Sequence, residues 1–169
     1  CKDFSGNKLF KIACGPNSSD YGWTETIMKN LGKWNTRGIS LHYYTLPTGD
    51  WGHKGDAVDF TTDEYYATIS KTLYMEELVT RHGEIMNRYD PEHEIGLIVD
   101  EWGCWYDVEK GTNPGFLYQQ NTMRDAIVAA CNLNIFNRHS DRVIMANLAQ
   151  AVNVLQALLL TEGEKLVKT

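Results

Sequence analysis

A pair of acidic residues, Asp100 and Glu101, follows the most apolar run in the sequence. The run covers Ile95 to Val99, and two tryptophans, Trp102 and Trp105, come soon after the pair. A carboxylate beside such a run is partly withdrawn from water, which is costly unless the group has a partner or a function. Glycoside hydrolysis uses such groups, because two carboxyl groups act across the scissile bond while aromatic rings stack on the sugar. The same residues also fit the start of a solvated loop, and the local pattern leaves both interpretations open.

A second polar pair, His42 and Tyr44, closes the strand predicted for Ile39 to Tyr44. The two residues alternate with Tyr43, so both side chains point to the same side of the strand. An imidazole and a phenol there could hydrogen-bond a carboxylate, although a lone histidine on a strand is usually structural. No second histidine or carboxylate stands at metal-ligand spacing, so we expect no metal site.

The long segment from Thr45 to Asp59 follows the same predicted strand and contains Trp51. Long loops at such a place often shape substrate pockets. Trp51 could be a platform for a sugar ring or could fasten the loop, and the second interpretation is slightly favoured. The sequence contains no GxSxG turn, so a serine hydrolase is not supported.

Apolar runs predict the strands of a parallel sheet at residues 11–15, 39–44, 95–99 and 143–147. Near-continuous apolar strands that alternate with helices are typical of a parallel sheet covered by helices. Such units fit a doubly wound sheet or half of an eight-stranded barrel. Polar and aromatic residues gather just after the strands, where barrel enzymes build their sites, and no glycine-rich nucleotide-binding turn follows any strand. The sequence therefore favours the barrel.

Helices are predicted between these strands from caps and from the spacing of apolar residues. Ser19 or Asp20 can cap the first helix, Thr61 and Glu64 form a capping box for the second, and Asn113-Pro114 opens the third. A last, short helix is predicted from Ala151 to Leu160. The residues expected to face the core are Trp23, Ile27, Leu31 and Trp34 in the first helix, Tyr66, Ile69 and Leu73 in the second, and Met123, Ala126, Ile127, Ala130 and Cys131 in the third.

The composition limits the class of protein. The 169 residues, 43% of them hydrophobic, suffice for one domain with a core. A formal net charge of −6 argues against non-specific nucleic-acid binding. No apolar stretch predicts a membrane span and no signal-peptide pattern is present, although the chain opens on Cys1 rather than Met and the N-terminus is expected to be missing. The 4 cysteines form no CxxC pair, which favours reduced, packed thiols over a zinc site or a disulfide framework.

Four segments resemble the family-51 glycoside hydrolases, the alpha-L-arabinofuranosidases, and they stand in that family's order. They are Ser40–Tyr44, Gly96–Tyr106, Asn113–Asp125 and Ala146–Leu155. The resemblance covers nearly the whole chain and implies an eight-stranded (β/α) barrel followed by a small β-sandwich. Residues 1–160 would then supply strands five to eight of the barrel, and residues 161–169 would begin the β-sandwich.

The same resemblance implies a role for five residues. Glu101 matches the catalytic nucleophile at the end of strand seven, and Tyr44 matches the tyrosine that hydrogen-bonds the nucleophile. Gln150 matches a glutamine that contacts the bound arabinose, Trp105 matches an aromatic wall of the site, and His42 lies next to the site. The family's acid/base glutamate belongs to an Asn-Glu pair that ends strand four, and this sequence contains no Asn-Glu dipeptide. We therefore expect the chain to start after strand four and to be inactive by itself.

On this resemblance, the full-length protein is expected to remove terminal alpha-L-arabinofuranosyl groups from arabinose-containing plant polysaccharides and oligosaccharides, with net retention and without a cofactor. Two alternatives stay open, namely another retaining barrel glycosidase, such as an endoglucanase or xylanase, and an inactive sugar-binding fragment. We expect no nucleic-acid or membrane partner. The family often forms oligomers and many bacterial members are intracellular, so a homo-oligomer is compatible with the resemblance and the cytoplasm is the favoured compartment.

Overall fold

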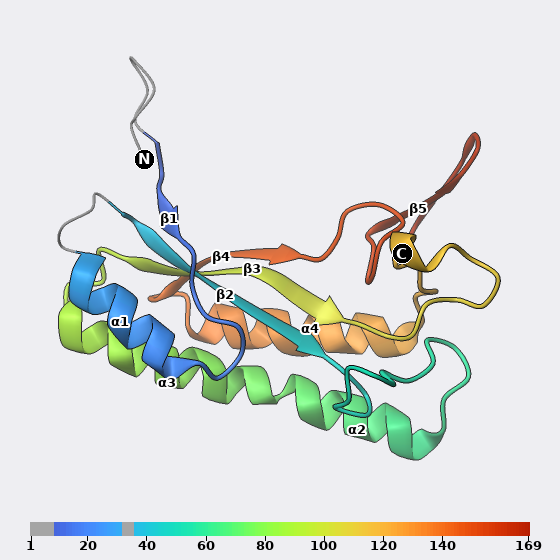
Figure 1. The fold of residues 1–169 in the computed structure, drawn as a ribbon, viewed down its shortest axis with the longest axis horizontal. Coiled ribbons are helices and arrows are strands. Elements are labelled where there is room, and N and C mark those ends of the chain that lie inside the picture. Colours follow the sequence, from blue (N-terminus) through green and yellow to red (C-terminus); the bar gives the residue numbers. More distant parts are fainter. Residues whose placement is uncertain (1–8, 32–35) are drawn as a thin grey trace.

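The computed structural model describes residues 9–31 and 36–169, and its centre is a sheet of parallel strands (Figure 1). The strands are β1 (Ile12–Ala13), β2 (Gly38–Thr45), β3 (Gly96–Cys104) and β4 (Val143–Leu148), and they follow one another across the sheet in that order. All neighbouring pairs are parallel, which requires a crossover connection between each strand and the next. The predicted α/β class with a parallel sheet is confirmed.

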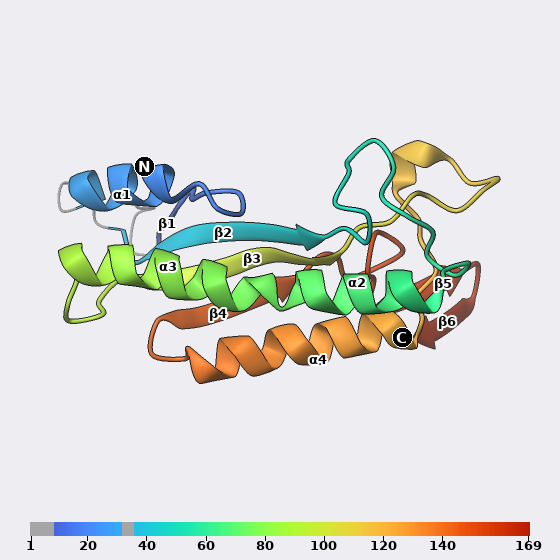
Figure 2. The same ribbon diagram turned by 90° about the horizontal axis from the view of Figure 1, so that it is seen from below.

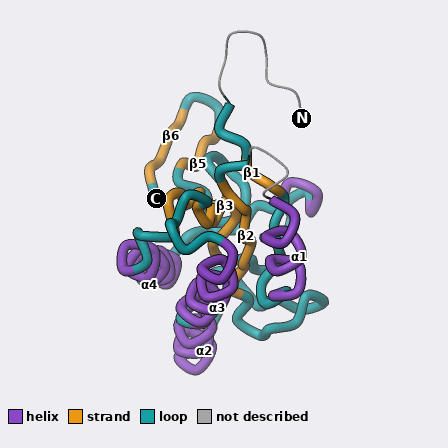
Figure 3. The backbone as a smooth tube through the Cα atoms, turned by 90° about the vertical axis from the view of Figure 1, so that its left-hand side faces the viewer, coloured by secondary structure: helices purple, strands orange, loops and turns teal. Residues whose placement is uncertain are grey.

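The crossover helices all lie on one side of the sheet, as Figure 3 shows. They are α1 (Tyr21–Leu31), α2 (Thr62–Thr72), α3 (Tyr74–Tyr89) and α4 (Met123–Arg138). Figure 2 shows α2 and α3 running end to end beneath the strands. One helix was predicted between β2 and β3, and the structure has two. No helix in the described part of the chain is long and apolar enough to cross a membrane.

The main core lies between the sheet and helices α3 and α4. Its strand residues include Ile39, Leu41, Leu97 and Val99, and its helix residues include Met75, Leu78, Val79, Met86, Ile135 and Phe136. Burial of each such side chain contributes about 1.5–3 kcal/mol. Helix α3 supplies the largest share because its apolar residues recur at helical spacing from Met75 to Met86. The core therefore fixes the sheet from one side.

The predicted caps of α1 and α2 are confirmed, but the predicted core faces are largely wrong. Asp20 Oδ1 accepts a hydrogen bond from Trp23 N at 3.0 Å, and Thr61 forms its capping box with Glu64. The buried polar residues of these helices are Thr24 in α1 and Thr68 and Thr72 in α2. Trp23, Tyr66 and Leu73 are exposed, and Ile27 and Ile69 are half-buried. Trp34 and the side chain of Leu31 lie outside the described residues.

The third predicted helix begins later than expected and turns a different side to the core. Pro114–Phe116 forms only a short 3-10 turn, η1, and α4 starts after Thr122, which makes a capping box with Asp125. Met123, the first residue of the predicted core stripe, is 73% exposed. Ala126, Ile127 and Ala130 are exposed as well, and Cys131 is half-buried. The buried side consists of Arg124, Asp125, Val128, Asn132, Ile135 and Phe136. Polar residues lie inside here because their side chains hold loops and backbone groups.

The helix predicted from Ala151 to Leu160 does not form. Asn153 and Leu155 have positive φ angles of 55° and 53°, a conformation that a right-handed helix excludes. The segment is irregular up to β5 (Leu159–Glu162), which pairs antiparallel with β6 (Lys165–Lys168). This hairpin lies beyond the carboxyl ends of the sheet strands (Figure 1).

Both edges of the sheet expose apolar side chains. Ile12 on β1 and Ile144 and Met145 on β4 are exposed. The strand predicted at residues 11–15 is therefore confirmed only over Ile12–Ala13, and it is not buried in this chain. The prediction from Val143 to Asn147 agrees with β4 in position. An exposed apolar edge strand invites pairing with further strands.

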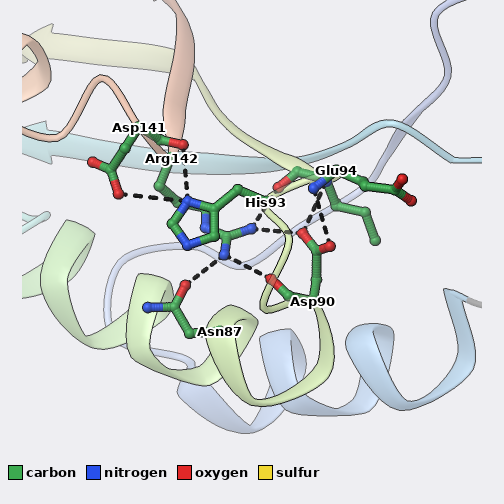
Figure 4. A network of polar contacts seen from close by, with 7 residues as sticks. Asn87, Asp90, His93, Glu94, Asp141 and Arg142 are labelled. Carbon is green, nitrogen blue, oxygen red and sulfur yellow. Dashed lines mark hydrogen bonds and ion pairs between the residues drawn. The ribbon is translucent and has the colours of Figure 1, made fainter.

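A buried ion pair closes the amino-terminal end of β3 and β4 (Figure 4). Arg142 Nη1 donates to Asp90 Oδ2 at 2.7 Å and to the Ile95 carbonyl at 2.9 Å. Burial by itself would raise the pKa of Asp90, but hydrogen bonds from the Ile95 and Glu94 amides and from Arg142 bring that pKa below its usual value. The network ties the end of α3 to the starts of β3 and β4.

Candidate active site

Strand β3 contains one extra residue at Asp100 and Glu101 relative to both neighbouring strands. The pairs on either side of this bulge are Ser40 with Ile98 and His42 with Glu101 toward β2, and Val99 with Ala146 and Trp102 with Leu148 toward β4. Successive side chains of a regular strand point to opposite faces, and a bulge changes that direction locally. Asp100 and Glu101 can therefore both face His42.

Glu101 accepts a hydrogen bond from the phenol of Tyr44. The distance from Tyr44 Oη to Glu101 Oε2 is 2.8 Å, and His42 Nδ1 lies 3.6 Å from the same oxygen. Burial first, and then the neighbouring Glu101 carboxylate, raise the pKa of Tyr44 well above its usual value, so the phenol stays protonated and acts as the donor. The Glu101 side chain is 47% exposed, and a substrate can reach it from solvent.

Three aromatic rings form a row beside Glu101. The ring of Trp105 packs edge-on against Tyr44 with 4.9 Å between centroids and against Trp51 with 5.3 Å. Trp51 is 52% exposed. Edge-to-face pairs hold rings in fixed relative orientations, so Trp51 both fastens the loop after β2 and leaves an aromatic surface open to solvent.

The loop after β2 is held in place by Arg124, which was not among the predicted site residues. Arg124 donates to the carbonyl oxygens of Asp56 and Ala57 at 2.8 Å and 3.2 Å. Its guanidinium lies between the rings of Phe60 and Tyr106, at 3.7 Å and 4.2 Å from their centroids. The capping box of Thr122 and Asp125, next to Arg124, is a sequence signal that marks the start of α4.

The carboxyl end of β3 is completed by two buried glutamines, Gln119 and Gln156. Gln156 Oε1 accepts from the Cys104 amide at 2.9 Å, and Gln119 Nε2 donates to the Cys104 carbonyl at 3.1 Å. These side chains satisfy backbone groups at the point where strand pairing ends. The segment that leads from Glu101 to Trp105 is therefore anchored at its far end.

Four of the five predicted site residues are in direct contact: Glu101 with Tyr44 and His42, and Tyr44 with Trp105. Gln150 is exposed and follows β4, where the Ala149 amide donates to the Trp102 carbonyl at 3.0 Å. Within the described part of the chain, no hydrogen bond or ion pair joins the Gln150 side chain to the other four. Gln150 thus lies at the same edge of the sheet without a polar contact to them.

Neither a metal cluster nor a disulfide is found among residues 9–31 and 36–169. No group of three or more His, Cys, Asp and Glu side chains in those ranges could hold a metal ion. Cys14, Cys104 and Cys131 are free thiols, of which Cys104 is buried, Cys131 half-buried and Cys14 exposed. Cys1 lies outside the described residues.

Comparison with known proteins points to one family. Residues 100–169 match the family model described as the alpha-L-arabinofuranosidase C-terminal domain. The whole chain is 48% identical to an intracellular exo-alpha-L-arabinofuranosidase of Bacteroides ovatus, and it covers 32% of that protein. The chain therefore spans about a third of that relative's length.

Two solved structures have the same fold. The crystal structure of the GH51 arabinofuranosidase from Xanthomonas axonopodis pv. citri superposes with a TM-score of 0.94 at 50% identity, over 99% of this chain and 34% of that one. An arabinose complex of the alpha-L-arabinofuranosidase from Thermotoga maritima gives 0.73 at 25% identity, over 95% of this chain and 29% of that one.

Proposed function

This chain belongs to the family-51 alpha-L-arabinofuranosidases, and on that premise we propose that the protein removes non-reducing-end alpha-L-arabinofuranosyl groups from arabinose-containing oligosaccharides and polysaccharides. The observation that carries the proposal is the half-exposed Glu101 carboxylate, hydrogen-bonded by Tyr44 at 2.8 Å. The relative from Bacteroides ovatus is named an exo-enzyme, which supports release of terminal groups.

Glu101 is the proposed nucleophile of a retaining mechanism. Both of its close contacts, with Tyr44 and His42, are made by Oε2, and Oε1 is the atom left to attack the anomeric carbon. A second carboxyl group protonates the leaving oxygen and then activates water, and retention requires a separation of about 5–5.5 Å between the two groups. That second group is proposed to lie in a part of the protein outside this chain, because no Asn-Glu pair occurs here.

The aromatic row formed by Tyr44, Trp105 and Trp51 is the proposed wall of the sugar site. Carbohydrate rings present apolar faces that stack on aromatic side chains, and such contacts orient the sugar without a charge. Trp105 would form one wall of the site beside the arabinose that is covalently bonded to Glu101. Trp51, which is farther along the row and more exposed, would contact the next part of the substrate. Gln150 is proposed to contact the arabinose from the end of β4.

The sheet itself is proposed to be strands five to eight of a (β/α)8 barrel, formed by residues 1–160, with residues 161–169 beginning a β-sandwich. The support is the pair of exposed apolar edges at Ile12 and Ile144, together with the helices on one side of the sheet. Closing the barrel with further strands would cover both edges. The exposed apolar residues of α4, Met123, Ile127 and Leu133, would then pack against a neighbouring helix.

The test is Glu101→Ala in the complete protein, assayed with para-nitrophenyl alpha-L-arabinofuranoside. We expect loss of turnover and partial recovery with external azide, which replaces the missing nucleophile. Glu92→Ala is the matched control, because Glu92 is exposed and lies between α3 and β3, at the opposite end of the sheet. Undiminished turnover by Glu101→Ala would exclude the role.

The alternative glycosidases, an endoglucanase or a xylanase, are distinguished by the substrate that is cleaved. Release from the glucoside or the xyloside, and not from the arabinofuranoside, would favour an endoglucanase-like or xylanase-like enzyme. This chain by itself is still predicted to be inactive.

We also propose an intracellular location, because the Bacteroides ovatus relative is named an intracellular enzyme. The homo-oligomer stays a prediction.

A further inference from the structure

We propose that Asp100 is a positioning residue that acts on Glu101 through the ring of His42. The inference rests on the proposed glycosidase function of Glu101. The two ring nitrogens of His42 face two different carboxylates, with Nε2 3.1 Å from Asp100 Oδ1 and Nδ1 3.6 Å from Glu101 Oε2. Among the hydrogen bonds and ion pairs of the described residues, those of the His42 imidazole are the only ones that reach both members of the acidic pair.

The backbone of His42 is fixed independently of its ring. The His42 carbonyl accepts from the Ser18 amide at 2.8 Å, and the His42 amide donates to the Pro16 carbonyl at 3.2 Å. Because the main chain of His42 is held in this way, only rotation of its side chain could still move the ring. A contact at Nε2 restricts this rotation.

Asp100 supplies that contact. Its Oδ1 atom is closed to solvent and has no hydrogen-bond partner of standard geometry, but it lies 3.1 Å from His42 Nε2, within ion-pair distance. A carboxylate oxygen accepts and does not donate, so the contact favours the tautomer with the proton on Nε2. When one ring nitrogen of a histidine is held by a carboxylate, the orientation and the tautomer of the whole ring are set. Nδ1 then carries a lone pair and faces Glu101 Oε2 at 3.6 Å without donating to it.

The consequence for Glu101 is a fixed choice between its two oxygens. The Tyr44 phenol donates to Oε2, and the oriented ring, whose Nδ1 atom lies 3.6 Å from the same oxygen, limits rotation of the carboxylate and leaves Oε1 for the substrate. The bulge in β3 is what makes this possible, since without the extra residue Asp100 and Glu101 would point to opposite faces. Asp100 does not touch the substrate in this scheme.

The experiment is a double-mutant cycle of Asp100→Asn and His42→Gln in the complete enzyme. If Asp100 acts through His42, Asp100→Asn alone lowers kcat about tenfold with KM changed less than about twofold, and adds less than about twofold in the His42→Gln background. Equal effects in both backgrounds would overturn the proposal. Asp141→Asn is the matched control, because Asp141 also faces a histidine, His93 at 3.5 Å, but at the opposite end of the sheet (Figure 4).

A second readout does not depend on activity. Nitrogen NMR of labelled histidine, assigned with His42→Gln, should report the Nε2-protonated tautomer in the wild type and a mixture in Asp100→Asn. Asp100→Ser serves if the asparagine variant does not fold. An unchanged tautomer would overturn the inference. If the wild-type enzyme cleaves no glycoside at all, the proposed function fails, and the NMR result still decides whether Asp100 fixes the ring.

Discussion

His82 Nε2 lies 2.8 Å from the carbonyl oxygen of Ser18, and this contact joins helix α3 to the loop that supports the site strand. A carbonyl only accepts, so Nε2 carries the proton and Nδ1 accepts from the hydroxyl of Thr24 at 2.8 Å. Ser18 in turn donates its amide to the carbonyl of His42. A fully buried, neutral histidine therefore holds the backbone on which His42 is mounted.

This arrangement predicts a stability that depends on pH. Burial is the main cause that lowers the pKa of His82 below its usual 6.5. The unfolded chain then takes up the proton first, so the contribution of His82 is complete above about pH 6.5 and is lost as the pH falls through the folded-state pKa. Unfolding midpoints at pH 7.5 and pH 5.5 should therefore differ more for the wild type than for His82→Gln. His53→Gln, at an exposed histidine, is the control, and equal pH dependence of all three proteins would contradict the prediction.

Tyr44→Phe removes the hydroxyl that donates to Glu101 Oε2. A hydrogen bond to a charged group contributes about 1.5–3 kcal/mol, which corresponds to a loss of roughly tenfold to a hundredfold in kcat/KM. Steady-state kinetics on the arabinofuranoside measure this loss. Tyr66→Phe is the control, because Tyr66 is exposed on α2. A change of less than about twofold in Tyr44→Phe would mean that the phenol does not orient the nucleophile.

The ion pair at the amino-terminal end of the sheet should affect stability and leave the chemistry intact. The side chains of Arg142 and Asp90 are 4% and 8% exposed, so Arg142→Met leaves an unpaired buried carboxylate and should lower the free energy of unfolding by about 3–5 kcal/mol. Arg138→Met breaks a surface pair with Glu76 and should cost at most about 1 kcal/mol. Denaturant titration gives both values. Similar costs for the two variants would refute the assignment of the larger contribution to the buried pair.

Trp51→Ala should weaken the binding of longer substrates more than that of the small nitrophenyl arabinofuranoside. The physical reason is that Trp51 lies at the open end of the aromatic row, one ring beyond Trp105. We expect KM for arabino-oligosaccharides to rise about fivefold, which is about 1 kcal/mol and within the range of one aromatic contact. Trp51→Phe keeps a ring and should retain most of the affinity. An equal rise in KM for both substrates would argue that Trp51 only fastens the loop.

Local features of the fold could be predicted from the sequence because neighbouring residues determine them. The strands from Ile39, Ile95 and Val143 and the caps at Asp20 and Thr61 agree with the structure in position. A strand that is buried on both sides needs a continuous apolar run, and a cap needs one polar side chain at the first turn. Both signals lie within a few residues of the element that they define.

The sequence by itself thus determined the parallel α/β class and the strand that leads to Glu101. It also determined that another strand ends with His42 and Tyr44 on one side. Only the tertiary structure decided which helix faces are buried, because polar residues such as Arg124 and Thr72 have partners in distant segments that hold them inside. It also decided the bulge at Asp100, since an extra residue in one strand is defined only against the strands beside it. The contacts of Asp100 and Glu101 with His42 depend on that bulge, and the bulge cannot be predicted from any single stretch of the sequence.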